Sequence, residues 1–281
     1  MDLQEKVKRV QEFRLIDDVF FEVFVKDIPA CQEILRTILE DEYLIVHDVI
    51  VQSSERNLYG RSVRLDALCT LGNGSKCNIE VQRSNNDNHL KRARFNAAVI
   101  TARSSDQGEK FDAVLELYII YISEFDFLGG GLTTYHVDKT IRENGMVVDD
   151  GLHEIFVNTV IKDGSSISDL MTCFSSKEVN TPEFPAVTRR FKELKSEGGA
   201  SAVCEIMEKY LSEAKNEGWT EGIAEGRAEG RAEGITEGKT EERIKAIQKM
   251  LHKGFDKQTI LSLDYTEEEY QEAEASMLAS I

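Results

Sequence analysis

Several residue types that would define a class of protein are scarce in this chain. It has three prolines and one tryptophan in 281 residues, and its five cysteines form no CxxC pair. This spacing argues against a zinc site or a disulfide framework, so the cysteines are expected to be reduced and mostly buried. The longest apolar run, VLELYIIYI, is too short to span a membrane and is interrupted by Glu116. The first residues, MDLQEKVKRVQEF, contain no apolar secretory segment, which predicts a cytoplasmic protein without a membrane partner.

Positive charge is also in deficit. Lysine and arginine together number 34 against 51 aspartates and glutamates, which gives a net charge of −17. Because phosphate binding requires a basic surface, this balance argues against tight non-specific binding of nucleic acid. It leaves room for a metal-dependent nuclease, whose site is acidic and whose bound cation reverses the local charge. The five histidines show no metal-ligand spacing, and His89 is expected to be an exposed residue at the start of a helix.

Residues 61–82, RSVRLDALCTLGNGSKCNIEVQ, form the most informative stretch. Apolar and polar residues alternate on both sides of a glycine-rich turn, and successive side chains on a strand point to opposite faces. The stretch therefore predicts two paired strands, each with one apolar and one polar face. The apolar positions are Val63, Leu65, Ala67, Cys69 and Leu71 before the turn and Cys77, Ile79 and Val81 after it.

The length of the turn decides whether Asp66 and Glu80 meet. With a two-residue turn, Asp66 lies opposite Val81 and the two carboxylates lie on opposite faces. With a three-residue loop over 72–74, in which Gly74 takes the left-handed conformation, Asp66 lies opposite Glu80. Directly opposed residues have Cβ atoms about 4.5–5.5 Å apart, close enough for two carboxylates to share one cation. We expect the three-residue loop, because a slip by one residue would turn one apolar set to the wrong face.

Two carboxylates that face each other repel unless a cation lies between them. This register therefore predicts a hard metal, Mg²⁺ or alternatively Mn²⁺, bound by Asp66, Glu80 and the backbone carbonyl of Val81. A metal held in this way can activate a water and stabilise the charge that builds up during phosphodiester hydrolysis. Gln82 carries no charge, so we expect it to orient the water or a phosphate oxygen instead of acting as a base. Asp66, Glu80 and Gln82 are thus the candidate catalytic residues.

The order of Asp66, a hairpin and then Glu80-Val81-Gln82 resembles the D…ExK core of PD-(D/E)XK nucleases, with glutamine in the lysine position. In this form it is similar to the recombination-promoting nuclease (Rpn) and transposase family of bacteria. Other segments along most of the chain carry the same resemblance, namely IDDVFFEVF, VRLDAL, NIEVQR, KRARFNAAVI, YIIYISEFDFLGGGLTTY, HEIFVN, ISDLMTCF and the glutamate-glycine tail.

The resemblance implies an α/β fold with a PD-(D/E)XK restriction-endonuclease-like core, in which a mixed β-sheet is flanked by helices, and a C-terminal helical tail. It implies a DNA substrate and a role in recombination or mobile-element activity. It also implies that an acidic residue of the first helix approaches the metal. Asp18 or its neighbour Asp17 is the candidate, and a solvated helix face is the alternative. Because the Rpn pattern itself carries glutamine, Gln82 does not imply an inactive enzyme.

Basic residues lie close to the candidate site in the sequence. Lys91, Arg92 and Arg94 cluster near the start of a helix predicted over 89–103, and Arg64 is expected on the same face as the carboxylates. These four side chains are the candidates for contacts to DNA phosphates, since each neutralised phosphate releases counterions. An ordinary basic helix face is the alternative.

The rest of the pattern predicts the elements around this core. The glycine triplet 129–131 is expected in a loop, which lacks the lysine of a phosphate-binding P-loop. Further helices are predicted over 3–25, 29–39, 166–174 and 187–211, the last interrupted near 198–199. Further strands are predicted over 44–51, 115–123, 133–142 and 153–160, the last two linked around 143–145.

The last part of the chain contains an internal repeat, in which Glu-Gly recurs every four residues from 217 to 238. Glycine costs about 1 kcal/mol relative to alanine in a helix, so a partly disordered linker competes with a helix that another copy could approach closely. We favour the helix. The predicted organisation is a nuclease-like domain over 1–190, a helical segment over 191–244 and a helical hairpin over 245–281, with homo-oligomerisation through the tail.

These patterns together predict a Mg²⁺-dependent DNA endonuclease that hydrolyses phosphodiester bonds. The alternative is a catalytically weak relative that binds DNA or a partner protein, or that oligomerises. The uncharged Gln82 and the acidic composition motivate this alternative.

Overall fold

The computed structural model describes the backbone of residues 3–56, 62–85 and 88–278, and the side chains of residues 4–51, 65–85, 88–209 and 238–277. The chain divides into two compact units, Met1–Lys209 and Tyr210–Ile281, and each is described by itself.

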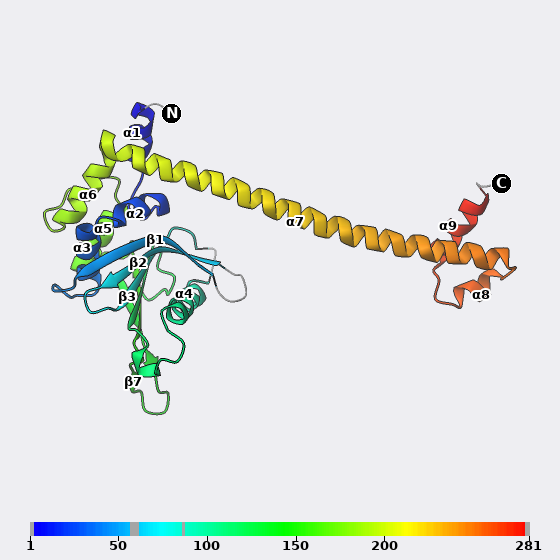
Figure 1. Ribbon diagram of the computed structural model, residues 1–281, viewed down its shortest axis with the longest axis horizontal. Coiled ribbons are helices and arrows are strands. Elements are labelled where there is room, and N and C mark those ends of the chain that lie inside the picture. The colour runs from blue at the N-terminus through cyan, green and yellow to red at the C-terminus, as the bar shows by residue number, and fades with distance from the viewer. Residues whose placement is uncertain (1–2, 57–61, 86–87, 279–281) are drawn as a thin grey trace. The chain divides into compact units, whose positions relative to one another are not determined.

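The first unit is built on a mixed sheet of six strands in the order β1-β2-β3-β4-β8-β5 (Figure 1). Strands β1, β2 and β3 pair antiparallel, β3 pairs parallel with β4 and β4 with β8, and β5 pairs antiparallel with β8. The two central parallel pairs require crossover connections, and α4 supplies the one between β3 and β4. The strands are β1 (Val46–Arg56), β2 (Ser62–Leu71), β3 (Lys76–Gln82), β4 (Leu117–Ser123), β5 (Thr134–Val137) and β8 (Leu152–Asn158).

Helices cover both faces of this sheet. Helices α2, α3, α5 and α6 lie on one face and α4 lies on the other (Figure 1). Because β4 is covered on both faces, its residues form an almost continuous apolar run, as the sequence predicted. The helices are α1 (Leu3–Gln11), α2 (Asp18–Val25), α3 (Ile28–Ile38), α4 (His89–Arg103), α5 (Ser166–Ser175) and α6 (Pro185–Lys195), with a short 3₁₀ turn over Phe111–Ala113. The predicted fold, a mixed sheet flanked by helices, is confirmed.

The predicted first helix, residues 3–25, is wrong, because a turn separates α1 from α2. Within this turn the N–H of Ile16 donates to the carbonyl of Phe174 at 3.2 Å, a bond that a continuous helix could not make. Ile16 is fully buried, so the apolar spacing continues across the break and conceals it from periodicity. The break places Asp17 at the N-cap position of α2 and Asp18 in its first turn.

The predicted strand over 133–142 is also interrupted. After β5 the chain forms a separate two-stranded sheet from β6 (Lys139–Thr140) and β7 (Val147–Val148). The predicted turn over 143–145 is present, with Gly145 in the left-handed conformation at φ 73°, but it joins β6 to β7. The main sheet resumes only at β8.

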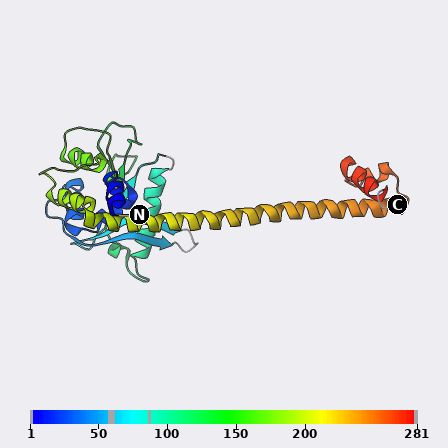
Figure 2. The ribbon, with the colours of Figure 1, turned by 90° about the horizontal axis from the view of Figure 1, so that it is seen from above.

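The second unit has a small core of its own. Helix α7 (Glu197–His252) begins in the first unit, runs through the Glu-Gly repeat and ends in the second. Helices α8 (Lys257–Leu261) and α9 (Glu267–Leu278) pack beside its C-terminal end (Figure 2). The buried residues are Ile247, Ile260, Tyr270 and Ala273. The favoured helical form of the Glu-Gly repeat is therefore confirmed. No helix within the described residues is long and apolar enough to cross a membrane.

All five cysteines are free and buried, as predicted. Cys31 and Cys69 lie with their sulfur atoms 3.6 Å apart between α3 and β2. Their neighbourhood is apolar, and the contact with Cys69 together with burial raises the pKa of the Cys31 thiol well above its usual value. These thiols act as small apolar core residues.

Two adjacent glycines at the start of α7 allow a direct test of the corner between α6 and α7. A Cβ atom on Gly199 would overlap the carbonyl oxygen of Glu193 and the backbone of Leu194, whereas a Cβ atom on Gly198 would come no closer than 4.0 Å to the Ser196 hydroxyl. We expect Gly199→Ala to destabilise the protein by about 1–3 kcal/mol and Gly198→Ala to be neutral or to stabilise it by up to about 1 kcal/mol. Urea unfolding of both variants tests this expectation, and equal stabilities would contradict it.

Candidate functional site

The hairpin between β2 and β3 has the predicted register. Ala67 pairs with Ile79 and Thr70 with Lys76, and the N–H of Leu71 donates to the carbonyl of Ser75 at 2.9 Å. The loop over 72–74 has three residues, and Gly74 takes a φ of 89°, which favours glycine. Asp66 and Glu80 are therefore the next opposed pair after Ala67 and Ile79.

At this next pair the two carboxylates accept hydrogen bonds from backbone N–H groups of the opposite strand. The N–H of Val81 donates to Asp66 Oδ2 at 2.9 Å, and the N–H of Asp66 approaches Glu80 Oε1 at 3.4 Å. Each acidic side chain thus accepts a bond from a backbone N–H of the opposite strand. This reciprocal arrangement holds both carboxylates side by side at the end of the paired part of the hairpin.

Burial and mutual repulsion shape the electrostatics of the pair. Glu80 is 1% exposed, and burial raises its pKa to about 7 even though Asn78 and Arg92 oppose the shift. The Asn78 amide donates to Glu80 Oε1 at 3.0 Å, and Arg92 Nη2 lies 3.7 Å from Glu80 Oε2. Burial and the charge of Glu80 also raise the pKa of Asp66 well above its usual value. The charged form of the pair is therefore unfavourable in the metal-free protein, and a bound cation would stabilise it.

The structure distinguishes between the two candidate aspartates of the first helix. The charge of Asp18 contributes, after burial, to the raised pKa values of both Asp66 and Glu80. Asp18 as a residue is exposed, but burial around its carboxylate still raises its own pKa. Asp17 is buried and engaged elsewhere, with its Oδ1 at 2.6 Å from Arg83 Nη1. Asp18 is therefore the better candidate for a role near the pair.

The residues after Glu80 contribute differently from one another. Val81 uses its N–H to hold Asp66, and a metal contact of its carbonyl remains a prediction. Gln82 is half-buried and its amide donates to the carbonyl of Ser84 at 2.8 Å. By strand alternation Gln82 lies on the same face of β3 as Glu80, where it could turn toward a bound water or phosphate.

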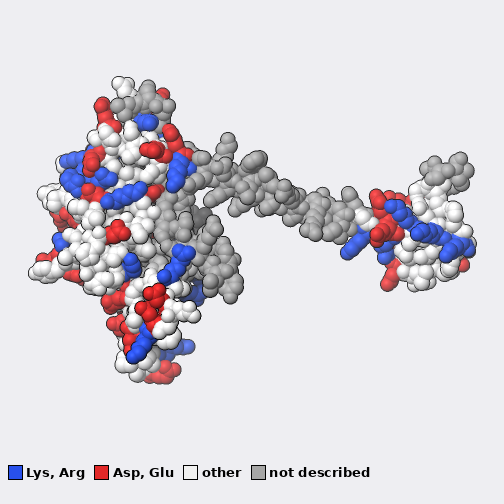
Figure 3. Space-filling view, in the orientation of Figure 1, with Lys and Arg blue, Asp and Glu red and all other residues white. Residues whose placement is uncertain are grey.

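Of the four predicted DNA-contacting cations, Arg92 lies beside the pair. Lys91 is exposed at the start of α4. Arg94 is also exposed, and its charge partly opposes the rise that burial causes in the pKa of Glu154. Arg64 lies in β2, paired with Ser54 of β1, and its side chain is outside the described residues. On the face of the first unit seen in Figure 3, basic and acidic side chains are interspersed.

The sequence interpretation missed three residues of this region. Asn78 is fully buried next to Glu80, Arg83 pairs with Asp17, and His89 is buried, whereas the sequence predicted it to be exposed. His89 Nδ1 lies 2.7 Å from the Tyr121 hydroxyl, because α4 packs its first turn directly onto the sheet. The alternation in β3 could have identified Asn78, since it shares the polar face with Glu80 and Gln82.

The glycine loop after β4 does not present a phosphate site. The backbone N–H groups of Gly129 and Gly131 donate to the carboxylate of Asp126, at 3.0 and 2.8 Å. The hydroxyl of Tyr135 accepts from Gly130 and donates to Asp126 at 2.7 Å. The loop therefore already binds an anion, and that anion is its own aspartate.

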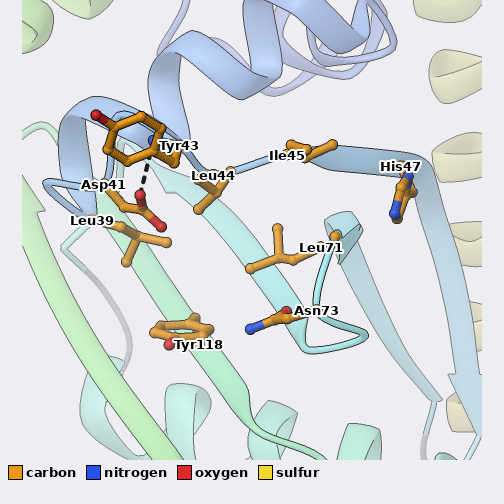
Figure 4. A pocket seen from close by; sticks show the side chains of 10 residues that line it. Leu39, Asp41, Tyr43, Leu44, Ile45, His47, Leu71, Asn73 and Tyr118 are labelled. Carbon is orange, nitrogen blue, oxygen red and sulfur yellow. Dashed lines mark hydrogen bonds between the residues drawn. The ribbon is translucent and has the colours of Figure 1, made fainter.

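A hollow of about 560 Å³ lies at the far end of the hairpin from the carboxylate pair (Figure 4). It surrounds the loop over 72–74 and is lined by aromatic, aliphatic and a few polar side chains, among them Tyr43, Tyr118, Asp41 and Asn73. None of the predicted site residues lines it, so this hollow is separate from the candidate site.

A hard metal fits the donor set at Asp66 and Glu80, although the protein supplies few ligands. Within the described residues, no group of three or more histidine, cysteine, aspartate or glutamate side chains is arranged to hold a metal ion. The two acids are oxygen donors whose charged forms a cation would stabilise, which suits Mg²⁺ or Mn²⁺ with retained waters. A role of Asp18 at the metal remains a prediction, and the only effect of Asp18 on the pair within the described residues is electrostatic.

The sheet order, the acidic pair at the end of a hairpin and the helix that covers its polar face define the PD-(D/E)XK class of nuclease folds. A family model described as PD-(D/E)XK nuclease family transposase matches residues 15–161. The match spans more than half of the chain and includes every strand of the main sheet, and the chain belongs to this family. No curated protein and no solved structure gives a significant match.

The raised pKa of Glu80 predicts how stability depends on pH in the absence of metal. Because the folded state holds this proton up to about pH 7 and the unfolded chain only to about its ordinary value of 4.5, stability falls as the pH rises through this interval. We expect the metal-free protein to melt at a lower temperature at pH 8 than at pH 5.5. Glu80→Gln should raise the melting temperature at pH 8 by a few degrees.

Thermal melts in EDTA at the two pH values measure this effect. Glu42→Gln, which changes an exposed glutamate, is the matched control and should behave as the wild type. If Glu80→Gln and the wild type lose the same stability between pH 5.5 and pH 8, the carboxylate pair is not the source of the pH dependence.

Proposed function

We propose that the protein is a Mg²⁺-dependent DNA endonuclease that cleaves phosphodiester bonds at the Asp66–Glu80 pair. Recombination or mobile-element activity is the role that family membership favours. The observation that carries the proposal is the pair itself, in which two carboxylates are held side by side by reciprocal bonds to the opposite strand. Such an arrangement is costly without a cation, because two neighbouring charges lose hydration together.

A divalent metal at this pair would supply the activation of water and the stabilisation of charge on the phosphate. The protein's own residues have distinct tasks around it. Asp66 and Glu80 provide oxygen ligands, and Asn78 fixes the orientation of the Glu80 carboxylate. Gln82 orients the attacking water or a phosphate oxygen without taking a proton, since an amide does not titrate. Arg92 lies close enough to Glu80 to contact the same phosphate.

DNA contacts beyond the pair are proposed for Arg64, Lys91 and Arg94, and homo-oligomerisation is proposed for the C-terminal tail. Family membership supports a DNA substrate. The exposed positions of Lys91 and Arg94 on α4 are compatible with phosphate contacts. The alternative of a catalytically weak DNA-binding relative is motivated by Gln82, and the cleavage test below separates the two.

The nuclease proposal predicts that Asp66→Asn and Glu80→Gln each lose plasmid nicking by at least about 100-fold, because each removes a charged metal ligand. Both variants should also lose Mn²⁺ binding in a calorimetric titration. Asp41→Asn is the matched control, because Asp41 lies in the hollow at the far end of the hairpin. It should retain both properties.

Three outcomes of this experiment are informative. Metal binding and nicking that both disappear in the site variants support the proposal. Metal binding by the wild type without any nicking supports the catalytically weak alternative. Wild-type protein that binds no metal, even with DNA present, contradicts the assignment of the pair as a metal site.

Asn78 provides a test of the metal site that does not depend on catalysis. Its amide N–H bond holds Glu80, so Asn78→Ala should lower Mn²⁺ affinity by about 10-fold or more while leaving the ligands in place. Asn96→Ala is the control, because Asn96 is a buried asparagine on α4 that the site does not use. Calorimetry on both variants, with melting curves to confirm folding, makes the comparison. Equal affinities in the two variants would contradict the positioning role.

A further inference from the structure

A second hollow, of about 560 Å³, lies between the end of α1, the start of α2 and the end of β3. Its charged lining residues are mostly basic. It is lined by Arg9, Glu12, Phe13, Arg14, Asp17, Arg83, Ser175 and Lys177. We propose that this hollow binds the phosphodiester group that neighbours the cleaved one along the same DNA strand. This inference rests on the proposed nuclease function.

The charge balance of the hollow favours an anion. Asp17 and Glu124 already form ion pairs with Arg14 and Arg83. Arg83 Nη1 lies 2.6 Å from Asp17 Oδ1 and its Nε donates to Glu124 Oε2 at 3.2 Å, while Arg14 pairs with both carboxylates. The lining residues alone comprise four cations and two carboxylates. An excess of cations at the surface of the hollow favours an anionic group such as a phosphodiester.

Donors are available at the mouth of the hollow. The side chain of Arg83 is 52% exposed, and the contacts described above engage its Nη1 and Nε, so its second amino group can bind a phosphate oxygen. Lys177 is 57% exposed and its partner Glu12 is 71% exposed, so this ion pair is weak and can exchange for a phosphate. Arg9 is exposed, and no ion pair within the described residues involves it.

The hollow is lined by residues that are adjacent in the chain to candidate site residues. Arg83 follows Gln82 directly at the end of β3, and Asp17 precedes Asp18. The neighbouring residue, Asp17, lines the hollow itself. A DNA strand with one phosphate at Asp66 and Glu80 therefore brings an adjacent phosphate toward Arg83. This continuity favours a strand phosphate over free phosphate as the occupant.

The test measures DNA affinity in full-length protein that carries Asp66→Asn, so that no cleavage occurs. Fluorescence anisotropy with a labelled duplex is recorded over a range of salt concentrations. The double variant Arg9→Ala/Lys177→Ala should weaken binding by about 10-fold and reduce the slope of log affinity against log salt by about 1. Lys192→Ala, which removes an exposed cation of α6, is the matched control and should bind as the parent does.

A variant that is expected to bind DNA more tightly is a useful second test, because misfolding would only weaken binding. Glu12→Gln removes an exposed acid from the rim of the hollow and frees Lys177, so it should raise DNA affinity about threefold. Unchanged affinity and salt slope in both the double variant and Glu12→Gln would overturn the proposal. A calorimetric titration with inorganic phosphate distinguishes the two sources of the anion. Tight phosphate binding that the double variant loses, with DNA affinity unchanged, would also overturn it.

Failure of the nuclease proposal gives a different result. A parent protein that binds no DNA at any salt concentration would contradict the proposed function, and the hollow with it. DNA binding that is equal in the parent and in the double variant would contradict the hollow alone.

Discussion

The separation of β2 from β3 beyond Ala67 and Ile79 is the constraint on which the candidate site depends. At this point the N–H of Val81 donates to the Asp66 carboxylate, and the N–H of Asp66 approaches the Glu80 carboxylate. A buried backbone donor without a partner is costly, so the same bonds that satisfy these N–H groups also hold the acids together. The same hydrogen bonds therefore affect both the stability of the strand ends and the positions of the two acidic side chains.

The surroundings of the pair disfavour its charged form. Glu80 is buried, the charge of Asp18 adds a small repulsion, and Arg92 of α4 opposes it from 3.7 Å. The Asn78 amide donates to Glu80, while its side-chain oxygen Oδ1 is buried and has no hydrogen-bond partner within the described residues. Such arrangements are usual at sites of function, where charge is stored for a ligand that is not part of the chain.

A network of ion pairs ties the ends of the central strands to the first helices. Arg83 follows β3, Glu124 follows β4, and both are joined to Arg14 and Asp17 in the turn before α2. The break between α1 and α2, which apolar spacing concealed, is therefore what brings Asp17 into this network. Asp17 lines the proposed phosphate hollow, and its neighbour Asp18 acts electrostatically on the carboxylate pair.

The hairpin and its register were predictable because strand alternation and the three-residue loop are local properties of residues 61–82. The mixed sheet and the family followed from motif order along the chain, and the match to residues 15–161 confirms them. The choice between Asp17 and Asp18, the burial of His89 and the role of Asn78 depended on how helices dock on the sheet. Such contacts join residues that are distant in sequence, so periodicity carries no information about them. The basic hollow likewise exists only because the turn before α2, the segment after α5 and the end of β3 converge in the folded chain.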